Sequence, residues 1–317
     1  MAIKTQRVLV VGATGAQGGS VARRLLFVNH YCMDGPPYAV RALTRNPRSP
    51  AAKALAARGA EIAVGSLDDP ASIRAALAGC DLVFGVTNYW EHLGAEVGHG
   101  GTLVDAVAAS DVRHLVLSTL PSAVELSGGR IDVPHMDMKA VIERYARDRL
   151  DAVTFVHVAY YYENFLTWFR PQPQADGTLA FGFPQGDTPL AAVSVEDVGP
   201  VVQSILDSAD AFRGKTVGIV GDDRPAADYA AAMGRVLGRT VRYNHIDRDV
   251  FARLPFPSAE DLAAMFDLNR RFIPDRRRDL MTSRRLHPGL LTFDAWMAMN
   301  HMRFATPELS AASTRAA

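Results

Sequence analysis

The sequence predicts an α/β protein: a doubly wound parallel sheet joined to a smaller, mostly helical C-terminal domain. Three observations lead to this prediction. Short apolar runs alternate with helical patterns through the first half of the chain, and the runs lack the polar alternation of strands with one wet face. This alternation of strand and helix patterns ends near Tyr160. Right-handed crossovers between such strands give one parallel sheet covered by helices on both faces.

The first half of the chain supplies the elements of this sheet in order. Strands are expected at residues 8–11, 38–44, 61–64, 82–86, 114–118 and 153–158. Helices are expected from Ala16 onward and at residues 49–58, 71–78, 101–109 and 139–147. A further strand is expected at 216–220. The pattern therefore divides the chain into a sheet domain at 1–159, to which 190–220 return, a smaller lobe within 160–305 and a flexible tail at 306–317.

Composition excludes several classes of function. Of the 317 residues, 34 are basic and 34 acidic, and this balance argues against direct nucleic-acid binding. The two cysteines, Cys32 and Cys80, exclude a disulfide framework and favour a reducing compartment. No segment approaches the roughly 20 consecutive apolar residues of a membrane span, and no secretory leader is recognised. We therefore expect a cytoplasmic protein, with a nuclear location left open.

A glycine-rich turn lies between the first strand and the first helix. The segment from Gly12 to Gly18 reads GATGAQG, so its glycines are spaced by three and three. In a Rossmann fold, such glycines permit the tight exit from the strand, the approach of backbone N–H groups to a pyrophosphate, and close packing of helix on strand. This context predicts a dinucleotide site, with contacts from the residues Gly12, Thr14, Gly15, Ala16, Gln17 and Gly18.

The end of the second strand indicates which dinucleotide is bound. NAD enzymes usually carry an acidic residue there for the ribose 2′-hydroxyl, whereas this sequence has Thr44-Arg45-Asn46-Pro47-Arg48. A guanidinium can bind a 2′-phosphate through two hydrogen bonds, and a carboxylate would repel it. We therefore predict NADP(H) as the cofactor, with Arg45 on the phosphate. Arg48 is left open between a phosphate contact and a solvated loop charge.

Several motifs together resemble a known family. They are GATGAQGGSVARRLL, VRALTRNPR, VTNYWE, HMDMKAVIERYAR, YYENF and DLAAMF. In this order they resemble the NmrA-like family, atypical members of the short-chain dehydrogenase/reductase superfamily, and most closely its animal NADPH-sensor branch. The resemblance runs from about Arg7 to Met302.

The resemblance implies an NADP(H)-binding Rossmann domain with a small C-terminal domain, and it implies further site residues. It places Thr87, Asn88 and Tyr89 along the cofactor and Lys139 near the nicotinamide ribose. It places the stretch from Tyr160 to Asn164, including Tyr161, near the nicotinamide. The sequence departs from the family pattern at Gly65-Ser66, where Gly-Asp is common, and at Ala159, where a proline is expected.

The residues that would carry chemistry also depart from the usual pattern. Ordinary short-chain reductases have a proton-donating tyrosine four residues before a lysine, and here that pair is His135 and Lys139. A histidine could donate the proton, as could one of the three tyrosines from Tyr160 to Tyr162, or His135 could simply pack near a helix start. Lys139, His135 and Tyr161 are accordingly the candidate catalytic residues.

Other candidate sites are weaker. Glu91, His92, Glu96 and His99 have metal-binding side chains, but their spacing matches no established motif, so we predict no metal. Ser118 lacks the flanking glycines of a hydrolase nucleophile elbow. The arginine-rich stretch from Arg270 to Arg285 is interleaved with acidic residues and is interpreted as a salt-bridged surface or a partner contact.

Two functions are compatible with these sequence observations. The first is an NADPH-dependent oxidoreductase of a small conjugated carbonyl, quinone or imine. The second is a non-catalytic redox sensor, in which NADP(H) occupancy changes loop structure and thereby regulates a partner protein. The expected partner is thus a small-molecule substrate or a regulated protein, without nucleic acid or membrane, and a homodimer is compatible with the chain.

Overall fold

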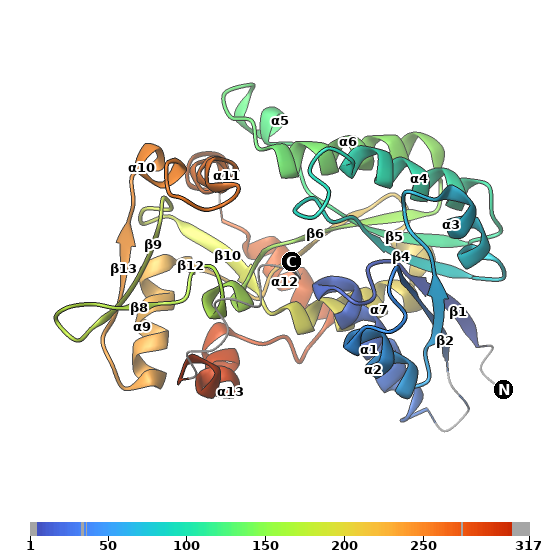
Figure 1. Cartoon of the computed structure of the whole chain (residues 1–317), viewed down its shortest axis with the longest axis horizontal. Coiled ribbons are helices and arrows are strands. Elements are labelled where there is room, and N and C mark those ends of the chain that lie inside the picture. Colours follow the sequence, from blue (N-terminus) through green and yellow to red (C-terminus); the bar gives the residue numbers. More distant parts are fainter. Residues whose placement is uncertain (1–4, 33–34, 36, 274, 306–317) are drawn as a thin grey trace.

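The computed structural model describes residues 5–32, 35, 37–273 and 275–305, so the expected tail at 306–317 lies outside it. Seven parallel strands form the main sheet in the order β11-β6-β5-β4-β1-β2-β3 (Figure 1). The chain order reverses between β1 and β4, as in doubly wound folds. The strands are β1 (Gln6–Val10), β2 (Tyr38–Thr44), β3 (Glu61–Val64), β4 (Leu82–Val86), β5 (His114–Thr119), β6 (Val153–Val158) and β11 (Thr216–Ile219).

Both faces of the sheet are buried, which explains the uniformly apolar strands. Along β1, Val8 and Val10 face one core while Leu9 faces the other. The first core lies beneath α1 (Ala16–Asn29), α2 (Pro50–Ala57) and α7 (Val198–Asp207). The second core lies beneath α3 (Pro70–Leu77), α4 (Glu96–Ala108) and α6 (Pro134–Arg149). The predicted α/β fold class is therefore confirmed.

Two helices begin earlier than the sequence pattern indicated. Helix α4 begins at Glu96 rather than Gly101, because the intervening glycines conceal its first turns from any hydrophobic pattern. Helix α6 begins at Pro134 rather than Lys139. A proline suits the first turn of a helix, where its missing N–H has no intrahelical partner. Both extensions add residues to the carboxyl edge of the sheet.

The chain leaves the main sheet after β6 and later returns to it. Residues 195–219 form η2 (Val195–Asp197), α7, α8 (Ala209–Phe212) and β11. Strand β11 pairs with β6 in parallel, and α7 packs against α1. Helix α12 (Arg277–Leu286) then contacts β11, so a late segment of the chain also borders the sheet.

The second lobe holds its own core, dominated by aromatic side chains. It contains η1 (Tyr162–Leu166) and two three-stranded sheets, which the sequence patterns did not predict. Their strands are β7 (Tyr160–Tyr161), β8 (Gln172–Pro173), β9 (Leu179–Phe183), β10 (Pro189–Val193), β12 (Asp222–Pro225) and β13 (Val241–His245). Its helices are α9 (Ala226–Leu237), α10 (Arg248–Ala252), α11 (Ala259–Phe272) and α13 (Phe293–Ala305).

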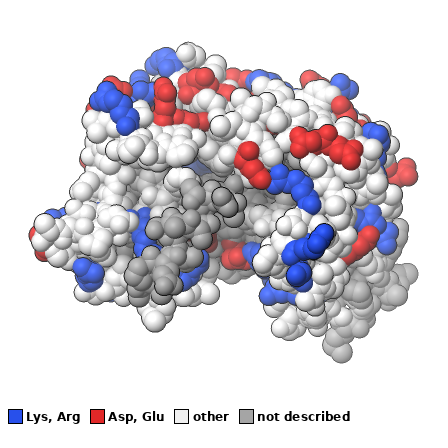
Figure 2. All heavy atoms as spheres, in the orientation of Figure 1, with Lys and Arg blue, Asp and Glu red and all other residues white. Residues whose placement is uncertain are grey.

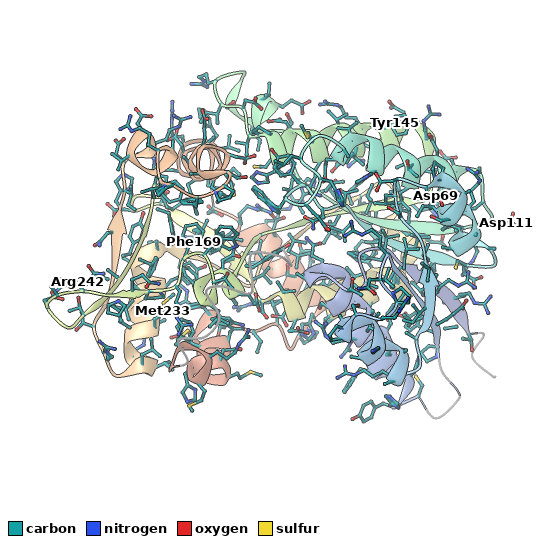
Figure 3. The ribbon with its side chains drawn as sticks, viewed as in Figure 1. Asp69, Asp111, Tyr145, Phe169, Met233 and Arg242 are labelled. Atoms are coloured by element: carbon teal, nitrogen blue, oxygen red, sulfur yellow. The ribbon has the colours of Figure 1, made fainter. Side chains whose placement is uncertain are left out.

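The aromatic core of the second lobe is separate from the cores of the main sheet. Phe169 and Met233 lie in the aromatic core, whereas Tyr145 lies on α6 beside the main sheet (Figure 3). The space-filling view shows a face that is hollowed between the two lobes (Figure 2). Within the described residues, no helix combines the length and hydropathy needed to cross a bilayer.

Candidate functional site

The glycine turn has the geometry that its spacing predicts. Gly12 has a φ of +71°, which favours glycine, and a Cβ there would lie 2.7 Å from Val86 Cγ1. A Cβ on Gly18 would lie 2.3 Å from the carbonyl oxygen of Gly12, so α1 can approach the turn only with glycine at this position. Thr14, Gly15 and Ala16 are exposed, and no side chain caps the N-terminus of α1. The turn thus presents helix N–H groups to an open surface.

The three consecutive tyrosines point in different directions. Tyr161 accepts a hydrogen bond from Gln17 Nε2 at 2.6 Å, which ties the second lobe to the glycine turn. Burial raises the pKa of Tyr161 to about 12, although the bond from Gln17 opposes the rise. Tyr160 and Tyr162 instead belong to the aromatic core. Of the three, Tyr161 is the one that contacts the predicted cofactor turn.

Arg45 lies directly after β2 and reaches across to the loop that follows β4. Its guanidinium lies 2.5 Å from Glu91 Oε1 and 2.9 Å from His92 Nε2. Partial burial opposes ionisation of Glu91, but Arg45 holds the pKa of that carboxyl below its usual range. The Arg45 side chain is 51% exposed. Arg45 is therefore accessible but already paired with a carboxylate.

Lys139 joins three elements beneath the same loop. Its ammonium donates to the carbonyl oxygen of Thr87 at 3.0 Å, to Thr87 Oγ1 at 2.9 Å and to Glu96 Oε1 at 2.6 Å. Burial lowers the pKa of Lys139, and the carboxylate of Glu96 opposes the shift. Glu96 is fully buried, and its Oε2 has no hydrogen-bond partner within the described residues. An ammonium has three donors, so protein groups occupy all of those on Lys139.

The remaining residues of the predicted site lie around this cluster. Asn88 Nδ2 donates to Glu91 Oε2 at 3.2 Å, and Tyr89 is buried beside Trp90, with their ring centroids 5.0 Å apart. Asn164 lies in η1, where its carbonyl accepts bonds from the backbone N–H groups of Thr167 and Phe169. Asn164 is thus on the same segment as Tyr161, two residues into the second lobe's first helix.

His135 contacts a residue that sequence reasoning missed. Its Nδ1 hydrogen-bonds Asp261 of α11, whose other carboxylate oxygen accepts the backbone N–H of His135 at 3.3 Å. Burial and the charge of Asp261 raise the pKa of the nearby Tyr89 to about 12. Asp261 lies 126 residues from His135, so no local spacing could have paired them. The motif DLAAMF contains it, but nothing in that motif indicates its partner.

The weaker candidates have separate partners. Glu91 and His92 contact Arg45, Glu96 contacts Lys139, and His99 contacts Asp68 at 2.7 Å. The described residues contain no group of three potential metal ligands. In the arginine-rich stretch, Arg270 and Arg271 pair with Asp267, and Arg276 pairs with Asp279.

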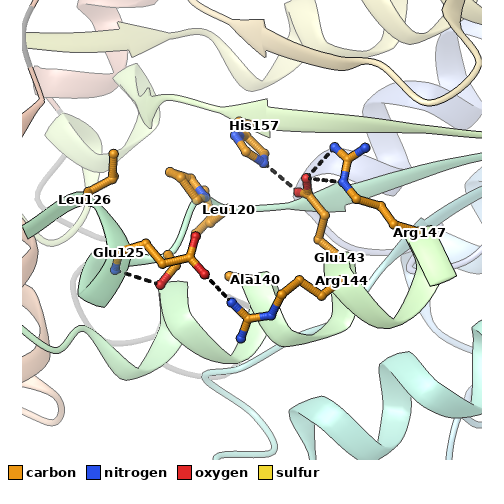
Figure 4. A pocket seen from close by; sticks show the side chains of 10 residues that line it. Leu120, Glu125, Leu126, Ala140, Glu143, Arg144, Arg147 and His157 are labelled. Carbon is orange, nitrogen blue, oxygen red and sulfur yellow. Dashed lines mark hydrogen bonds and ion pairs between the residues drawn. The ribbon is translucent and has the colours of Figure 1, made fainter. Parts of the chain in front are cut away.

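A separate pocket of about 410 Å³ lies between α5 (Ala123–Ser127), α6 and β6. Figure 4 shows His157 and Arg147 converging on the carboxylate of Glu143, while Arg144 pairs with Glu125 at the rim. None of the predicted site residues lines this pocket. Its polar groups are paired with one another, so it is not the site that the sequence indicated.

Fold and turn together define the class: a Rossmann-type α/β protein with a glycine-rich strand–turn–helix at the carboxyl edge of its sheet. The NmrA-like family model matches residues 4–296, which is nearly the whole chain. The chain belongs to the NmrA-like family, as the sequence resemblance indicated.

Curated relatives and solved structures agree with this assignment. The chain is 32% identical to the NmrA-like family domain-containing oxidoreductase FrzB of Cladobotryum sp. over 82% of each chain. It is 34% identical to the oxidoreductase hkm9 of Aspergillus hancockii over 84% of each chain. NmrA, a negative transcriptional regulator solved with NADP, superposes with a TM-score of 0.79 at 23% identity, covering 93% of this chain and 94% of that one. The NADPH complex of the Escherichia coli quinone oxidoreductase QOR2 superposes with a TM-score of 0.75 at 20% identity, covering 93% of this chain and 99% of that one.

Proposed function

We propose that this protein binds NADP(H) at the glycine turn and reduces a small conjugated carbonyl, quinone or imine. The observation that carries the proposal is the turn itself, in which Gly12 and Gly18 are sterically required and Thr14, Gly15 and Ala16 between them are exposed. The oxidoreductase names of FrzB and hkm9 support a catalytic role. The complexes of NmrA with NADP and with NAD, and of QOR2 with NADPH, support a nicotinamide dinucleotide as the cofactor, and the preference for NADP(H) rests on Arg45.

The residues at the turn fit a dinucleotide. The uncapped N-terminus of α1 offers N–H donors to a pyrophosphate. Gln17 Oε1 is buried and lacks a hydrogen-bond partner within the described residues, so it can accept from a bound group. Arg45 offers a guanidinium to a 2′-phosphate. A bound reduced nicotinamide supplies a hydride, and the protein supplies orientation and a proton.

The role of Lys139 follows from its present contacts. Because all three of its donors are occupied, it would have to exchange one acceptor to reach a ribose hydroxyl. As it stands, it fixes the carbonyl of Thr87 and therefore the backbone that leads into Asn88 and Tyr89. In the proposed function, Lys139 shapes the cofactor-facing loop, and any ribose contact comes at the expense of the Thr87 or Glu96 bond.

Turnover tests the proposal directly. Purified protein is mixed with NADPH and a panel of quinones, enones and cyclic imines, and the absorbance of NADPH is followed. We expect at least one class to cause substrate-dependent loss of absorbance, at a rate that saturates with substrate. NADPH that remains unchanged with every member of the panel, although it binds the protein, would sink the oxidoreductase proposal.

The sensor function is a second candidate, favoured by the contacts of Arg45. Since Arg45 holds Glu91 and His92, a 2′-phosphate on Arg45 would compete with these contacts and release the loop after β4. Trp90 lies in this loop and is 40% exposed, so its fluorescence can report the release. If the protein is a sensor, NADP⁺ should change this emission more than NAD⁺ does, and Trp90→Phe should remove the change. Emission that stays constant at saturating NADP⁺ would eliminate this candidate.

A further inference from the structure

A carboxylate from the second lobe holds the histidine at the start of α6. Nδ1 of His135 hydrogen-bonds one oxygen of Asp261, and the backbone N–H of His135 donates to the other oxygen at 3.3 Å. Each of the two side chains is only 8% exposed. Both oxygens of Asp261 therefore contact His135, which fixes the position and the rotation of the imidazole.

This arrangement determines which nitrogen can exchange a proton. An ionised carboxylate only accepts hydrogen bonds, so Nδ1 of His135 keeps its proton and Nε2 is the exchanging atom. Nε2 has no hydrogen-bond partner within the described part of the chain, whereas Nδ1 does. We call this pair of contacts between Asp261 and His135 the carboxylate clamp.

The surroundings place the imidazole at the predicted cofactor loop. The rings of Tyr89 and Trp90 flank it, with centroids 6.0 and 5.0 Å from that of His135. Lys139 follows one helical turn later on α6 and holds Thr87 of the same loop. His135 and Lys139 of α6 thus both lie against the segment from Thr87 to Trp90.

We propose that His135 is the proton donor of the reductase and that Asp261 is its positioning residue, contributed by the C-terminal lobe. This inference rests on the proposed oxidoreductase function. In the acid form of His135, both ring nitrogens carry protons. During reduction of a carbonyl, the oxygen takes the Nε2 proton while the carbon takes the hydride that the reduced nicotinamide supplies, and the C=O π bond breaks. His135 is left neutral with its proton on Nδ1, bonded to Asp261, and Nε2 recovers a proton from solvent.

The clamp also couples catalysis to the arrangement of the lobes. Asp261 is the third residue of α11, and α11 contacts α5 beside the main sheet. If the lobes separated, His135 would lose both the acceptor on Nδ1 and the anchor on its backbone. The proton donor is therefore complete only when the C-terminal lobe is seated against α6.

Asp261→Asn tests the clamp with little change in size. The first readout is the nitrogen NMR spectrum of His135, assigned by its disappearance in His135→Gln, because the spectrum reports the tautomer without any turnover. We expect the Nδ1–H tautomer in the wild type and its loss in Asp261→Asn. The second readout is reduction of 9,10-phenanthrenequinone, where we expect kcat to fall by about 10²- to 10⁴-fold, the range for loss of general acid catalysis. The Kd for NADPH, measured by fluorescence titration, should change by less than about threefold.

Two further variants control for folding. Asp267→Asn removes another buried carboxylate of α11, one that pairs with Arg270 and Arg271 and not with His135. It should keep the wild-type tautomer and kcat. Asp261→Glu restores a carboxylate and should recover the Nδ1–H tautomer if Asp261→Asn itself fails to fold.

The outcomes separate this inference from the proposed function. If the wild type reduces the quinone and His135→Gln or Asp261→Asn does so equally well, the acid–base pair is overturned while the reductase stands. An Nε2–H tautomer in the wild type would overturn the pair regardless of turnover. If the wild type reduces nothing, the reductase fails and the catalytic role of His135 fails with it, even where the tautomer is as expected.

Discussion

At the scale of single residues, the proposed preference for NADP(H) depends on Arg45. The sequence predicted its role from its position after β2, but it could not predict that Glu91 and His92 would already hold the guanidinium. Those contacts come from a loop that follows a different strand, so only the folded sheet brings them together. A 2′-phosphate that bound Arg45 would therefore have to replace a local ion pair.

We expect Arg45→Ala to weaken NADPH binding by about 10- to 100-fold, because hydrogen bonds to charged groups contribute about 1.5–3 kcal/mol. NADH lacks the 2′-phosphate, so its affinity should change by less than about threefold. Isothermal titration with both nucleotides measures the difference. Arg48→Ala removes the same charge from the same exposed loop, and its effect on the two nucleotides shows whether Arg48 also contacts the phosphate. Equal losses for the two nucleotides would show that Arg45 does not contact the phosphate.

Gly18 gives a second prediction at this scale. Since a Cβ there would lie 2.3 Å from a backbone oxygen, Gly18→Ala should separate α1 from the turn and cost about 1–3 kcal/mol of unfolding free energy. Gly98→Ala is the matched control, because Gly98 lies within α4 with open space around its Cα and should gain up to about 1 kcal/mol. Urea denaturation measures both. A Gly18→Ala variant as stable as the wild type would show that the turn tolerates a side chain.

At the scale of elements, helix α6 has a different role at each of its two ends. Its first two turns carry His135 and Lys139 toward the predicted site, and its later turns anchor it to the sheet. There Glu143 accepts hydrogen bonds from Thr119 of β5 at 2.5 Å and from Arg147, and it pairs with His157 of β6 at 2.8 Å. The half of α6 that faces the pocket in Figure 4 is therefore structural.

Glu143 should make stability depend on pH. Burial alone would raise its pKa, but the bonds from His157, Thr119 and Arg147 lower it to about 2 from the usual 4.5 of a glutamate. A depressed carboxyl pKa contributes stability above pH 4.5 that is lost as the pH falls toward 2. We expect the wild type to lose about 2 kcal/mol from this group between pH 7 and pH 3, and Glu143→Gln to lack that component.

Urea unfolding at the two pH values measures this change. Glu125→Gln is the control, because Glu125 forms an exposed pair with Arg144 and should leave the pH dependence as in the wild type. If Glu143→Gln and the wild type lose stability in parallel, another carboxyl is responsible.

The helices and strands also show which parts of the fold and the site the sequence can predict. The parallel strands were predictable because a sheet buried on both faces requires continuous apolar runs, as in Leu82-Val83-Phe84. Strands as short as β7 and β12 carry no periodic pattern, so the two small sheets were not predictable. Within the site, the glycine turn is local and was predictable. The contact between His135 and Asp261 depends on how two lobes dock, which no single segment encodes.

At the scale of the whole molecule, the cores of the two lobes support different parts of the predicted site. The cores of the main sheet support the glycine turn, while the aromatic core supports α11 and thereby Asp261. Phe266 of α11 stacks on Phe183 with ring centroids 4.4 Å apart, and both are fully buried. Damage to the aromatic core should thus affect the second lobe first.

We expect Phe266→Ala to cost about 3–5 kcal/mol of stability, as large-to-small changes of buried phenylalanines do. Hydrogen exchange should quicken in β9, α11 and α13, while β1, β4 and β5 keep their protection. NADPH affinity should change little, because the glycine turn packs on the main sheet and not on the aromatic core. Faster exchange in both lobes to the same extent would mean that the two cores unfold as one unit.

The bonds of Lys139 have a consequence for chemical labelling. Lys139 is one of only four lysines in a chain that otherwise uses arginine for its positive charge. Its side chain is only 12% exposed and its amine is engaged by Thr87 and Glu96, so an acylating reagent can react with it only when these bonds break. The rate at which this amine becomes labelled therefore reports how often these bonds open, and any molecule that stabilises the loop should slow the labelling.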